Sequence, residues 1–435
     1  MKKELITLLG NNEVGVVRRD SRGRLAFEYA DNWQRSGNAY PLSISMPLAA
    51  TQHPHAKIEP FLWNLLPDNK VILDRWGSRF HVSPGNAFAL MGAVGEDCAG
   101  AVRFVHPDRL GDVPREGDGN VEWLDEAAVE ARLQALREDI SAWRRMGDSG
   151  QFSLAGAQPK TALLFDGQRW GLPSGRMPTT HILKPAMAGL DGHAENEHFC
   201  LSLARSLQLV AAITSVARFG SEVALVVERY DRLKIHTDIQ RVHQEDFCQA
   251  LAVPPTTKYE NEGGPGAVAI ANVLRENSGS ADADIRSLVD ALAYNWLIAG
   301  TDAHGKNYSV LIGASGRVRL APLYDVASAL PYDDMYFPKL KLAMKIGGEY
   351  RLRSVGLHQW RTLARQLKLD QDEIVGRVGR LAAAMPDLAL QCLERCTQQK
   401  LNHPLLPRLA DRICQRAREC ARILTTSSSG GDSGG

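Results

Sequence analysis

The sequence predicts an α+β protein with two lobes, in which a β-rich N-terminal subdomain precedes a largely helical C-terminal lobe. The chain has 435 residues, more than one hydrophobic core usually serves, so we expect several domains. Short alternating strand patterns run to about residue 108, whereas amphipathic helical patterns dominate beyond about residue 240. Hydrophobic residues at 44% and charged residues at 23% are typical of globular proteins and exclude disorder across the body of the chain.

Residues 1–108 are expected to form the β-rich subdomain, because short apolar runs alternate there with turns. The clearest strand patterns are Val14–Val17, Leu25–Tyr29 and Gly100–Val105. A helix is expected over Pro60–Leu66, with a break at Pro67–Asn69. Residues 108–120 are rich in Gly and charge, so we place a domain boundary there.

Residues 109–150 are expected to be a linker followed by an amphipathic helix from Glu122 to about Arg145, because apolar residues recur near helical spacing. Residues 151–235 are expected to form an α+β core, in which strand-like runs alternate with a helix over Glu195–Leu207. The strand-like runs are Thr161–Phe165, Thr180–Leu183 and Val223–Val227.

Residues 236–424 are expected to be the helical lobe. Within it, Ile285–Ala299 carries apolar residues at helical spacing, and Gly300 offers a stop. Residues 425–435 contain only Thr, Ser, Gly and Asp, so they cannot bury a core and are expected to be disordered.

Charge and cysteine content limit the classes of partner and location. Because 51 Lys and Arg residues nearly balance 50 Asp and Glu residues, the whole chain has no electrostatic drive toward nucleic acid or an anionic membrane. The N-terminal apolar run is too short for a signal peptide, and no stretch approaches a transmembrane length, so we expect a cytoplasmic protein without a membrane partner. The seven cysteines lack Cys-x-x-Cys pairs, which fits reduced thiols. Cys392 and Cys396 lie one helical turn apart, and buried helix positions explain them more simply than a metal site.

The most informative segment is Gly300–Leu311, which places Asp302, His304, Lys306 and Asn307 in one short loop after a buried helix. Such a density of reactive side chains favours an active-site loop.

Two short strands follow this loop, over Tyr308–Leu311 and Arg317–Leu320. A hairpin returns the chain to its starting end, so Asn307 before it and Asp325 after it should lie close together. Asp302 should then face both side chains across the loop.

This order of residues matches the parts of protein kinases, which use Asp-x-x-x-x-Asn and a second Asp after a hairpin. In this interpretation Asp302 is the catalytic base, and Asn307 and Asp325 hold Mg²⁺, which prefers a few hard oxygen ligands. The alternative is a polar turn whose Asp and Asn side chains cap the hairpin, since the spacing alone arises often by chance.

Neither a Gly-x-Gly-x-x-Gly loop nor a Walker sequence precedes this site. In their place Ser153–Lys160 forms a small-residue turn whose backbone N–H groups can approach phosphates closely. Lys184 ends an apolar strand and Glu197 begins the next helix, the arrangement with which kinases hold the α and β phosphates. A solvated lysine at a strand end is the alternative for Lys184. Val226–Arg232 joins the two lobes, either as an adenine-binding hinge or as a plain cluster of charges at a strand end.

Taken together, these segments resemble the HipA family, the toxin kinases of bacterial type II toxin-antitoxin pairs. The likeness covers nearly the whole chain. The matching motifs are Pro41–Leu48, Asn64–Asp68, Ser153–Lys160, Thr179–Lys184, Asn196–Glu197, Val227–Arg232, Gln244–Asp246, Lys258–Glu260, Thr301–Asn307 and Pro322–Asp325.

The resemblance implies a bilobal, protein-kinase-like fold and a serine/threonine protein kinase that uses ATP and Mg²⁺. It implies Asp302 as catalytic base and Asn307 and Asp325 as metal ligands. The implied ATP contacts are Ala155, Gly156, Ala157, Gln158, Pro159, Lys160, Lys184, Glu228, Arg229, Tyr230, His304, Gly305, Lys306, Asn307, Tyr324, Asp325, Val326 and Ala327.

The resemblance also implies regulation and a cellular role. Family members phosphorylate themselves on the serine that matches Ser153, which ejects the phosphate loop and inactivates the enzyme. A phosphate beside Asp325 would suffer like-charge repulsion, which is a sufficient physical cause. The implied substrate is a glutamyl-tRNA synthetase, and the implied outcome is growth arrest and persistence.

The implied partner is a HipB-like helix-turn-helix antitoxin, through which the toxin acts as a co-repressor on operator DNA. Arginines near the C-terminus would face either DNA phosphates or solvent; they are Arg408, Arg412, Arg416, Arg418 and Arg422. Two other functions fit the same residues, a lipid or small-molecule kinase and a catalytically inactive DNA-bound co-repressor.

Overall fold

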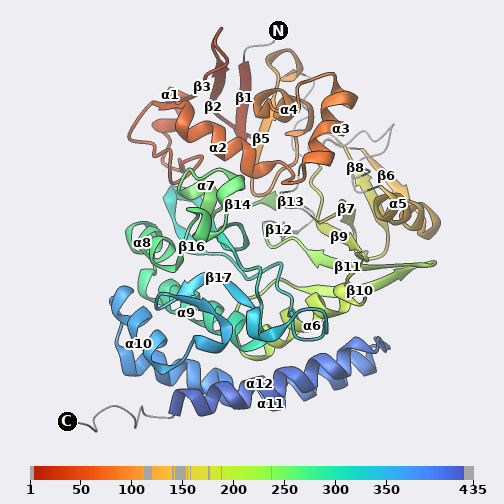
Figure 1. Ribbon diagram of the computed structural model, residues 1–435. Coiled ribbons are helices and arrows are strands. Elements are labelled where there is room, and N and C mark those ends of the chain that lie inside the picture. Colours follow the sequence, from red (N-terminus) through yellow and green to blue (C-terminus); the bar gives the residue numbers. More distant parts are fainter. Residues whose placement is uncertain are drawn as a thin grey trace.

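The computed structural model shows three layers stacked from the N-terminal subdomain to a helical base (Figure 1). It describes residues 4–111, 120–139, 142, 153, 155–156, 158–174, 177–187, 189–236 and 238–425. The tail after residue 425, expected to be disordered, and much of the expected linker lie outside the described residues. Within the described part of the chain, no helix combines the length and the apolar character needed to cross a bilayer.

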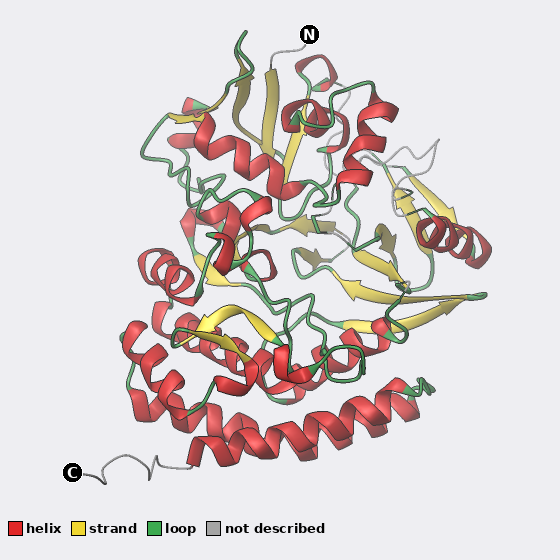
Figure 2. Ribbon diagram, in the orientation of Figure 1, coloured by secondary structure: helices red, strands yellow, loops and turns green. Residues whose placement is uncertain are grey.

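The N-terminal subdomain is an antiparallel sheet with the strand order β4-β3-β2-β1-β5, covered by helices (Figure 2). Its strands are β1 Glu4–Leu9, β2 Asn12–Arg19, β3 Leu25–Tyr29, β4 Gln52–Pro54 and β5 Val102–Val105. Its helices are α1 Asp31–Gln34, α2 His55–Leu65, α3 Lys70–Phe80 and α4 Ala87–Val94. Phe61 and Leu62 of α2 are fully buried against this sheet, and the helix ends at Leu65 before the predicted break. The end of α2 therefore has a fixed position above the rest of the molecule.

The middle layer is a second antiparallel sheet, with the strand order β10-β11-β9-β7-β8-β6. Its strands are β6 Val121–Leu124, β7 Thr161–Phe165, β8 Trp170–Pro173, β9 His181–Pro185, β10 Thr214–Phe219 and β11 Glu222–Glu228. The helices α5 Glu126–Glu138 and α6 His193–Ser206 pack against it. Val129 and Leu133 of α5 are buried with Leu163 and Leu183 of the sheet.

The expectation of a helix from Glu122 is wrong at its start. Residues Val121–Leu124 form strand β6, which pairs with β8. The helix begins only after Asp125, whose Oδ1 accepts a hydrogen bond of 2.8 Å from the Ala128 N–H. An aspartate at this position caps a helix N-terminus, so the apolar spacing before it belongs to a strand.

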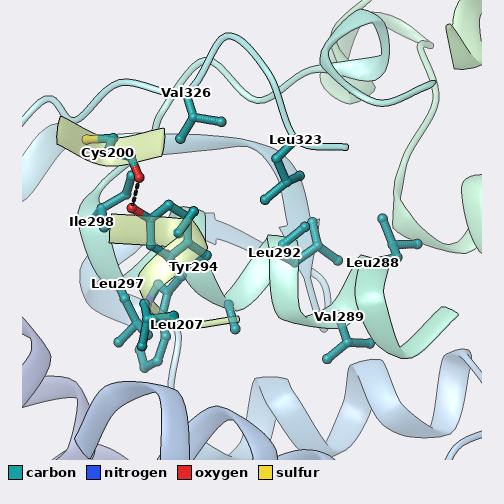
Figure 3. Close-up of a cluster of buried hydrophobic side chains, with 14 of the residues drawn as sticks. Cys200, Leu207, Leu288, Val289, Leu292, Tyr294, Leu297, Ile298, Leu323 and Val326 are labelled. Atoms are coloured by element: carbon teal, nitrogen blue, oxygen red, sulfur yellow. Dashed lines mark hydrogen bonds between the residues drawn. The ribbon is translucent and has the colours of Figure 1, made fainter. Parts of the chain in front are cut away.

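The C-terminal lobe is largely helical and is built around α9 (Figure 3). Leu288, Leu292 and Leu297 of α9 are buried, and the Tyr294 hydroxyl donates to the Cys200 carbonyl oxygen. The helices of this lobe are α7 Phe247–Ala250, α8 Ala267–Asn277, α9 Ala281–Ile298, α10 Leu357–Gln366, α11 Gln371–Gln398 and α12 Leu405–Thr425. Its strands are β12 Arg232–Ile235, β13 Asp238–Arg241, β14 His243–Asp246, β15 Ser309–Ile312, β16 Val318–Leu320, β17 Lys341–Ile346 and β18 Glu349–Arg351.

The long helices α11 and α12 form the base of the molecule (Figure 1). Cys392 and Cys396 are buried on α11, in agreement with the simpler of their two interpretations. Arg416 of α12 is also buried, and its Nε and Nη2 donate to the Trp296 carbonyl oxygen at 3.0 and 2.8 Å. Both interpretations of Arg416, as a DNA contact or as a solvated side chain, are therefore wrong. The side chain instead satisfies the C-terminal end of α9.

The N-terminal subdomain contacts the C-terminal lobe through buried polar groups. Glu245 on β14 is buried, and its Oε1 accepts a hydrogen bond of 2.7 Å from the Ile44 N–H. Ser45 donates from its hydroxyl to the Gln249 carbonyl oxygen at 3.1 Å. Burial raises the pKa of Glu245 to about 8, so this carboxyl is largely protonated near neutral pH.

This raised pKa predicts a loss of stability as the pH rises. In the unfolded chain Glu245 ionises near its ordinary pKa of 4.5, whereas the folded protein keeps it protonated up to about 8. The folded state then binds more protons across this range, so the free energy of unfolding falls from about pH 5 to about pH 8. We expect Glu245→Gln to make this fall smaller by about 1–3 kcal/mol, measured by urea denaturation at both pH values. Glu276→Gln on the exposed side of α8 is the control, and parallel curves for wild type and Glu245→Gln would contradict the prediction.

Candidate active site

A cavity of about 560 Å³ lies between the middle sheet and the C-terminal lobe, beneath the end of α2. Of the residues predicted to form the site, those lining it are Ala155, Gly156, Gln158, Lys160, Lys184, Glu228, Arg229, Tyr230, Asp302, His304, Lys306, Asn307, Tyr324, Asp325, Val326 and Ala327. Pro159 and Gly305 are described but do not line it, and Ala157 lies outside the described residues. The structure thus brings most of the predicted site into one place, while the roles of these residues stay predictions.

Lys184 is the central cation of the cavity. It lies on β9, where its Nζ donates to both carboxylate oxygens of Glu197 on α6, at 2.8 and 3.0 Å. The same Nζ donates to Asp325 Oδ1 at 2.8 Å. Burial alone would lower the pKa of Lys184, but the carboxylates of Asp325 and Glu197 outweigh it and raise that pKa above its ordinary value. The alternative of a solvated lysine at a strand end is therefore wrong.

Asp325 is held in an unusual conformation and kept ionised. Its backbone φ of 56° lies in the left-handed region, which residues other than glycine rarely adopt. Burial opposes its ionisation, but the ammonium groups of Lys184 and Lys160 outweigh this effect and hold the pKa of Asp325 well below its usual range. Backbone strain of this kind is concentrated at functional sites.

The loop after α9 places Asp302 and Asn307 on the same cavity. Asp302 Oδ1 accepts a hydrogen bond of 2.6 Å from the Tyr259 hydroxyl. Asn307 Nδ2 donates to the Asp325 carbonyl oxygen at 3.3 Å, so the hairpin of β15 and β16 does bring these two residues to one end. Its turn and its strands follow the predicted pattern.

The end of α9 differs slightly from the prediction. Ala299, not Gly300, adopts the left-handed conformation that ends the helix, with a φ of 54°. Gly300 is needed for another reason, because a Cβ there would lie 2.3 Å from Asn295 Oδ1. The chain can therefore turn sharply out of the helix toward Asp302.

His304 is largely buried and lies at the wall of the cavity. Its ring meets the Tyr259 ring edge-on, with 5.0 Å between the ring centres. Burial lowers the pKa of His304, although the Asp302 carboxylate opposes this, so the imidazole is neutral at physiological pH. Its role in the structure is to support the position of Tyr259.

The segment around Ser153 is held under the N-terminal subdomain. The Ser153 side chain is fully buried, and its hydroxyl donates to the Leu65 carbonyl oxygen at 2.7 Å. Lys160 Nζ donates to the Ala155 carbonyl oxygen at 2.6 Å and closes the loop. Gly156 has a φ of 103°, and a Cβ there would lie 2.7 Å from Lys160 Nζ. Only glycine fits this turn while Lys160 stays in place.

In the predicted hinge the Arg229 side chain is held in a buried network. The Arg229 guanidinium is buried and donates to Asp231, to the Thr179 hydroxyl and to the Cys98 carbonyl oxygen, each at 2.8 Å. Asp97 of the N-terminal subdomain joins the same network through Arg232 at 2.8 Å. These contacts fix the hinge against the subdomain, so its charged residues serve structure as well as lining the cavity.

Sequence reasoning missed the contribution of Asp68, Lys258 and Tyr259. The Asp68 carboxylate pairs with Lys306 Nζ at 2.7 Å and with Lys258 Nζ at 2.9 Å. Their motifs stood out in the sequence, but no role was assigned to them. Each lies far along the chain from the residues it contacts, so the sequence carries no signal for these pairings.

Asp302, Asn307 and Asp325 all line the cavity, and their side chains carry hard oxygen atoms of the kind that Mg²⁺ prefers. Within the described ranges, no three His, Cys, Asp or Glu side chains converge as a metal cage. A pair consisting of one amide and one carboxylate suits Mg²⁺, which keeps waters and takes few protein ligands when it binds with phosphates. The cavity as a whole suits a polyanionic ligand placed beside a carboxylate base.

Two family models match the chain, and together they span most of it. The HipA N-terminal domain matches residues 5–105, and the HipA-like C-terminal domain matches residues 152–389. A Sinorhizobium fredii protein that carries the name kinase Y4mE is 35% identical over 412 residues, covering 93% of this chain and 95% of the relative. The serine/threonine-protein kinase toxin HipA of Shewanella oneidensis is 33% identical over 395 residues, covering 87% of this chain and 86% of the relative.

A solved structure gives the same likeness in three dimensions. It is the complex of HipA, HipB and operator DNA from Shewanella oneidensis, and a chain in it matches with a TM-score of 0.82 at 28% identity. The match covers 97% of this chain and 98% of that chain. The predicted α+β, HipA-like fold is confirmed, as is the resemblance inferred from the motifs.

The contacts of Lys184 predict that its charge is needed for stability. Lys184→Met leaves Glu197 and Asp325 without the ammonium between them, so we expect the free energy of unfolding to fall by about 3 kcal/mol. Lys341→Met, at an exposed position on β17, is the matched control. Urea denaturation of both variants near neutral pH provides the measurement, and equal effects of the two substitutions would contradict the prediction.

Proposed function

Because the chain belongs to the HipA family of serine/threonine-kinase toxins, we propose that it transfers the γ-phosphoryl group of ATP to a serine of another protein. One observation carries the proposal. The Lys184–Glu197 pair, which kinases use to hold phosphates, lies on the same cavity as Asp302, Asn307 and Asp325. A purely architectural protein does not need this combination, and the choice of a protein acceptor over a lipid rests on the family.

In this proposal each wall of the cavity binds one part of ATP. The backbone of Ala155–Lys160 and the Lys184 ammonium bind the phosphates. The backbone of Glu228–Tyr230 binds the adenine through groups other than the Glu228 and Arg229 N–H, which donate to the Ile213 and Thr180 carbonyl oxygens. Asn307 and Asp325 hold Mg²⁺, which neutralises charge on the phosphate oxygens when it is bound.

Asp302 acts as the base. Its Oδ1 accepts the Tyr259 hydrogen bond, so its Oδ2 is the oxygen that orients the substrate hydroxyl and takes the hydroxyl proton. The hydroxyl oxygen forms the new bond to the γ-phosphorus, the bond to the β–γ bridging oxygen breaks, and ADP leaves with that oxygen. Positioning and charge stabilisation supply the rate enhancement, so the fixed contacts around Asp302 and Lys184 are the important ones.

The same proposal includes self-inactivation through Ser153. The buried Ser153 hydroxyl reaches a γ-phosphate only after the loop leaves the N-terminal subdomain, because it lies against the Leu65 carbonyl oxygen. A phosphate group carries close to two negative charges and could not return to a place beside carbonyl oxygens. Phosphorylation would therefore keep the loop out of the cavity and block ATP binding.

The cellular role is proposed from the relatives. The Shewanella oneidensis protein is named a toxin, and its solved structure includes HipB and operator DNA. We propose a HipB-like helix-turn-helix antitoxin as the partner of this chain, with operator DNA reached through it and a co-repressor role in the complex. A glutamyl-tRNA synthetase is the proposed protein substrate, in the cytoplasm, and growth arrest with persistence is the proposed outcome.

Incubation with Mg²⁺ and ATP should add one phosphate to the wild-type chain, a gain of about 80 Da in intact mass. We expect no gain for Asp302→Asn, which lacks the base, and none for Ser153→Ala, which lacks the acceptor. Ser153→Ala should still phosphorylate a glutamyl-tRNA synthetase, which separates loss of the acceptor from loss of activity. If ATP binds but neither protein is modified, the chain acts as a co-repressor without kinase activity.

The lowered pKa of Lys160 predicts that the affinity for ATP falls at high pH. Burial and the nearby Lys184 ammonium lower the pKa of Lys160 to about 8, so its positive charge is present below about pH 8 and is lost as the pH rises through it. We expect the Kd of a non-hydrolysable ATP analogue to rise up to about tenfold between about pH 7 and about pH 9, measured by calorimetry. Lys160→Arg stays charged and should show a flatter profile. Equal profiles for the two proteins would exclude Lys160 as a phosphate ligand.

A further inference from the structure

Asp68 brings a negative charge from the N-terminal subdomain into the cavity. It follows α2, and its carboxylate is almost fully buried between two ammonium groups. Oδ1 lies 2.7 Å from Lys306 Nζ, and Oδ2 lies 2.9 Å from Lys258 Nζ. Burial opposes ionisation of Asp68, but Lys306 and Lys258 outweigh it and lower its pKa, so the carboxylate is ionised at neutral pH.

The two lysines belong to the two segments that position Asp302. Lys306 belongs to the turn that ends at Asn307. Lys258 precedes Tyr259, which donates to Asp302, and the Lys258 carbonyl oxygen accepts a hydrogen bond of 3.2 Å from the Gly305 N–H. Both ammonium groups are therefore tied to the backbone that places the catalytic carboxylate.

The same subdomain segment also holds the phosphate loop. The Asp68 N–H donates to the Gly156 carbonyl oxygen at 3.3 Å. The Ser153 hydroxyl donates to Leu65, and Lys306 Nζ donates to the Asn64 carbonyl oxygen at 3.3 Å. Residues 64–68 thus contact the phosphate loop and the catalytic loop together, from a third part of the chain.

The two lysines keep hydrogen-bond donors that the contact with Asp68 does not use. Both ammonium groups pair with the one carboxylate of Asp68, and both residues line the cavity. Burying three charges is a poor way to join two domains, because the desolvation cost often exceeds the attraction. Each ammonium carries three donors, and Asp68 with the Asn64 carbonyl oxygen takes two from Lys306. Donors remain on both lysines for an anion in the cavity.

We propose that Asp68 is a positioning residue, through which the N-terminal subdomain sets Lys258 and Lys306 to bind the terminal phosphate of ATP during transfer. This inference rests on the proposed kinase function and adds to it a contribution from outside the C-terminal domain. Asp68 does not touch the reacting atoms; it fixes the direction of the two ammonium groups that do. The C-terminal domain alone would hold ATP but would lack this alignment.

The first measurement is phosphorus NMR of Mg²⁺-bound ATP on the Asp302→Asn protein, which has no base and so keeps the nucleotide intact. Adding Asp68→Asn should shift the γ-phosphorus resonance and leave the α-phosphorus resonance unchanged. Ser45→Ala is the matched control, since it weakens another contact between the subdomain and the lobe without touching either lysine. A γ-phosphorus resonance that is the same in all three proteins would overturn the proposal.

The second measurement is the rate of transfer in proteins that retain Asp302. We expect Asp68→Asn to lower kcat by about 10- to 100-fold, because small misplacements of charge-stabilising groups cost this much, while the Kd of ATP changes by less than about threefold. Asp68→Glu keeps the charge but displaces both lysines, so it tests the same idea if Asp68→Asn folds poorly. A fall in kcat no larger than that of Ser45→Ala would show that Asp68 only holds the two domains together and does not position the lysines.

The outcomes separate this inference from the proposed function. If the γ-phosphorus resonance shifts as expected but the wild type transfers no phosphate, the placement of the lysines stands and the kinase proposal fails. If the wild type transfers phosphate and Asp68→Asn matches Ser45→Ala in both measurements, the kinase proposal stands and this inference fails. Failure of the wild-type protein to bind ATP would refute both.

Discussion

Lys184 lies where three parts of the chain meet, and its charge joins the buried carboxylate of Glu197 to the carboxylate of Asp325, which is open to the cavity. Without it, Glu197 of α6 and Asp325 after the hairpin would repel each other across the cavity. The ammonium therefore fixes the distance between the middle sheet, the helix below it and the loop of the C-terminal lobe. The shape of the cavity follows from this balance of charges.

The sequence predicts well those parts of the site that lie close together along the chain. Asp302, Asn307 and the hairpin before Asp325 form one continuous segment, so local pattern and turn chemistry suffice to bring them together. Asp68 and Lys306 lie 238 positions apart, and their pairing depends on how the subdomain docks. Residues Val121–Leu124 show a second limit of prediction from the sequence. Their apolar spacing favours a helix, but they form an edge strand because they pair with β8 in the sheet.

The N-terminal subdomain is part of the site and more than an attached module. The end of α2 lines the cavity, Asp97 anchors the hinge, and the Leu65 carbonyl oxygen holds the Ser153 hydroxyl. These contacts are hydrogen bonds and ion pairs, and apolar side chains such as Tyr40 and Ile44 pack beside them against the C-terminal core. An interface of this kind requires exact geometry and tolerates little sliding, because each misplaced buried polar group loses its partner. Substitutions at the interface are therefore expected to act at a distance on the cavity.

The burial of Ser153 has a kinetic consequence. Any enzyme that modifies this hydroxyl, including a second copy of the chain, must wait for the segment to detach from the Leu65 carbonyl oxygen. The rate of modification is then the product of the fraction of detached molecules and the intrinsic rate of the chemistry, as in hydrogen exchange through local opening. Each 1.4 kcal/mol added to the free energy of detachment would slow modification about tenfold. The strength of the contact between Ser153 and Leu65 would thus determine how long a newly made molecule stays unmodified.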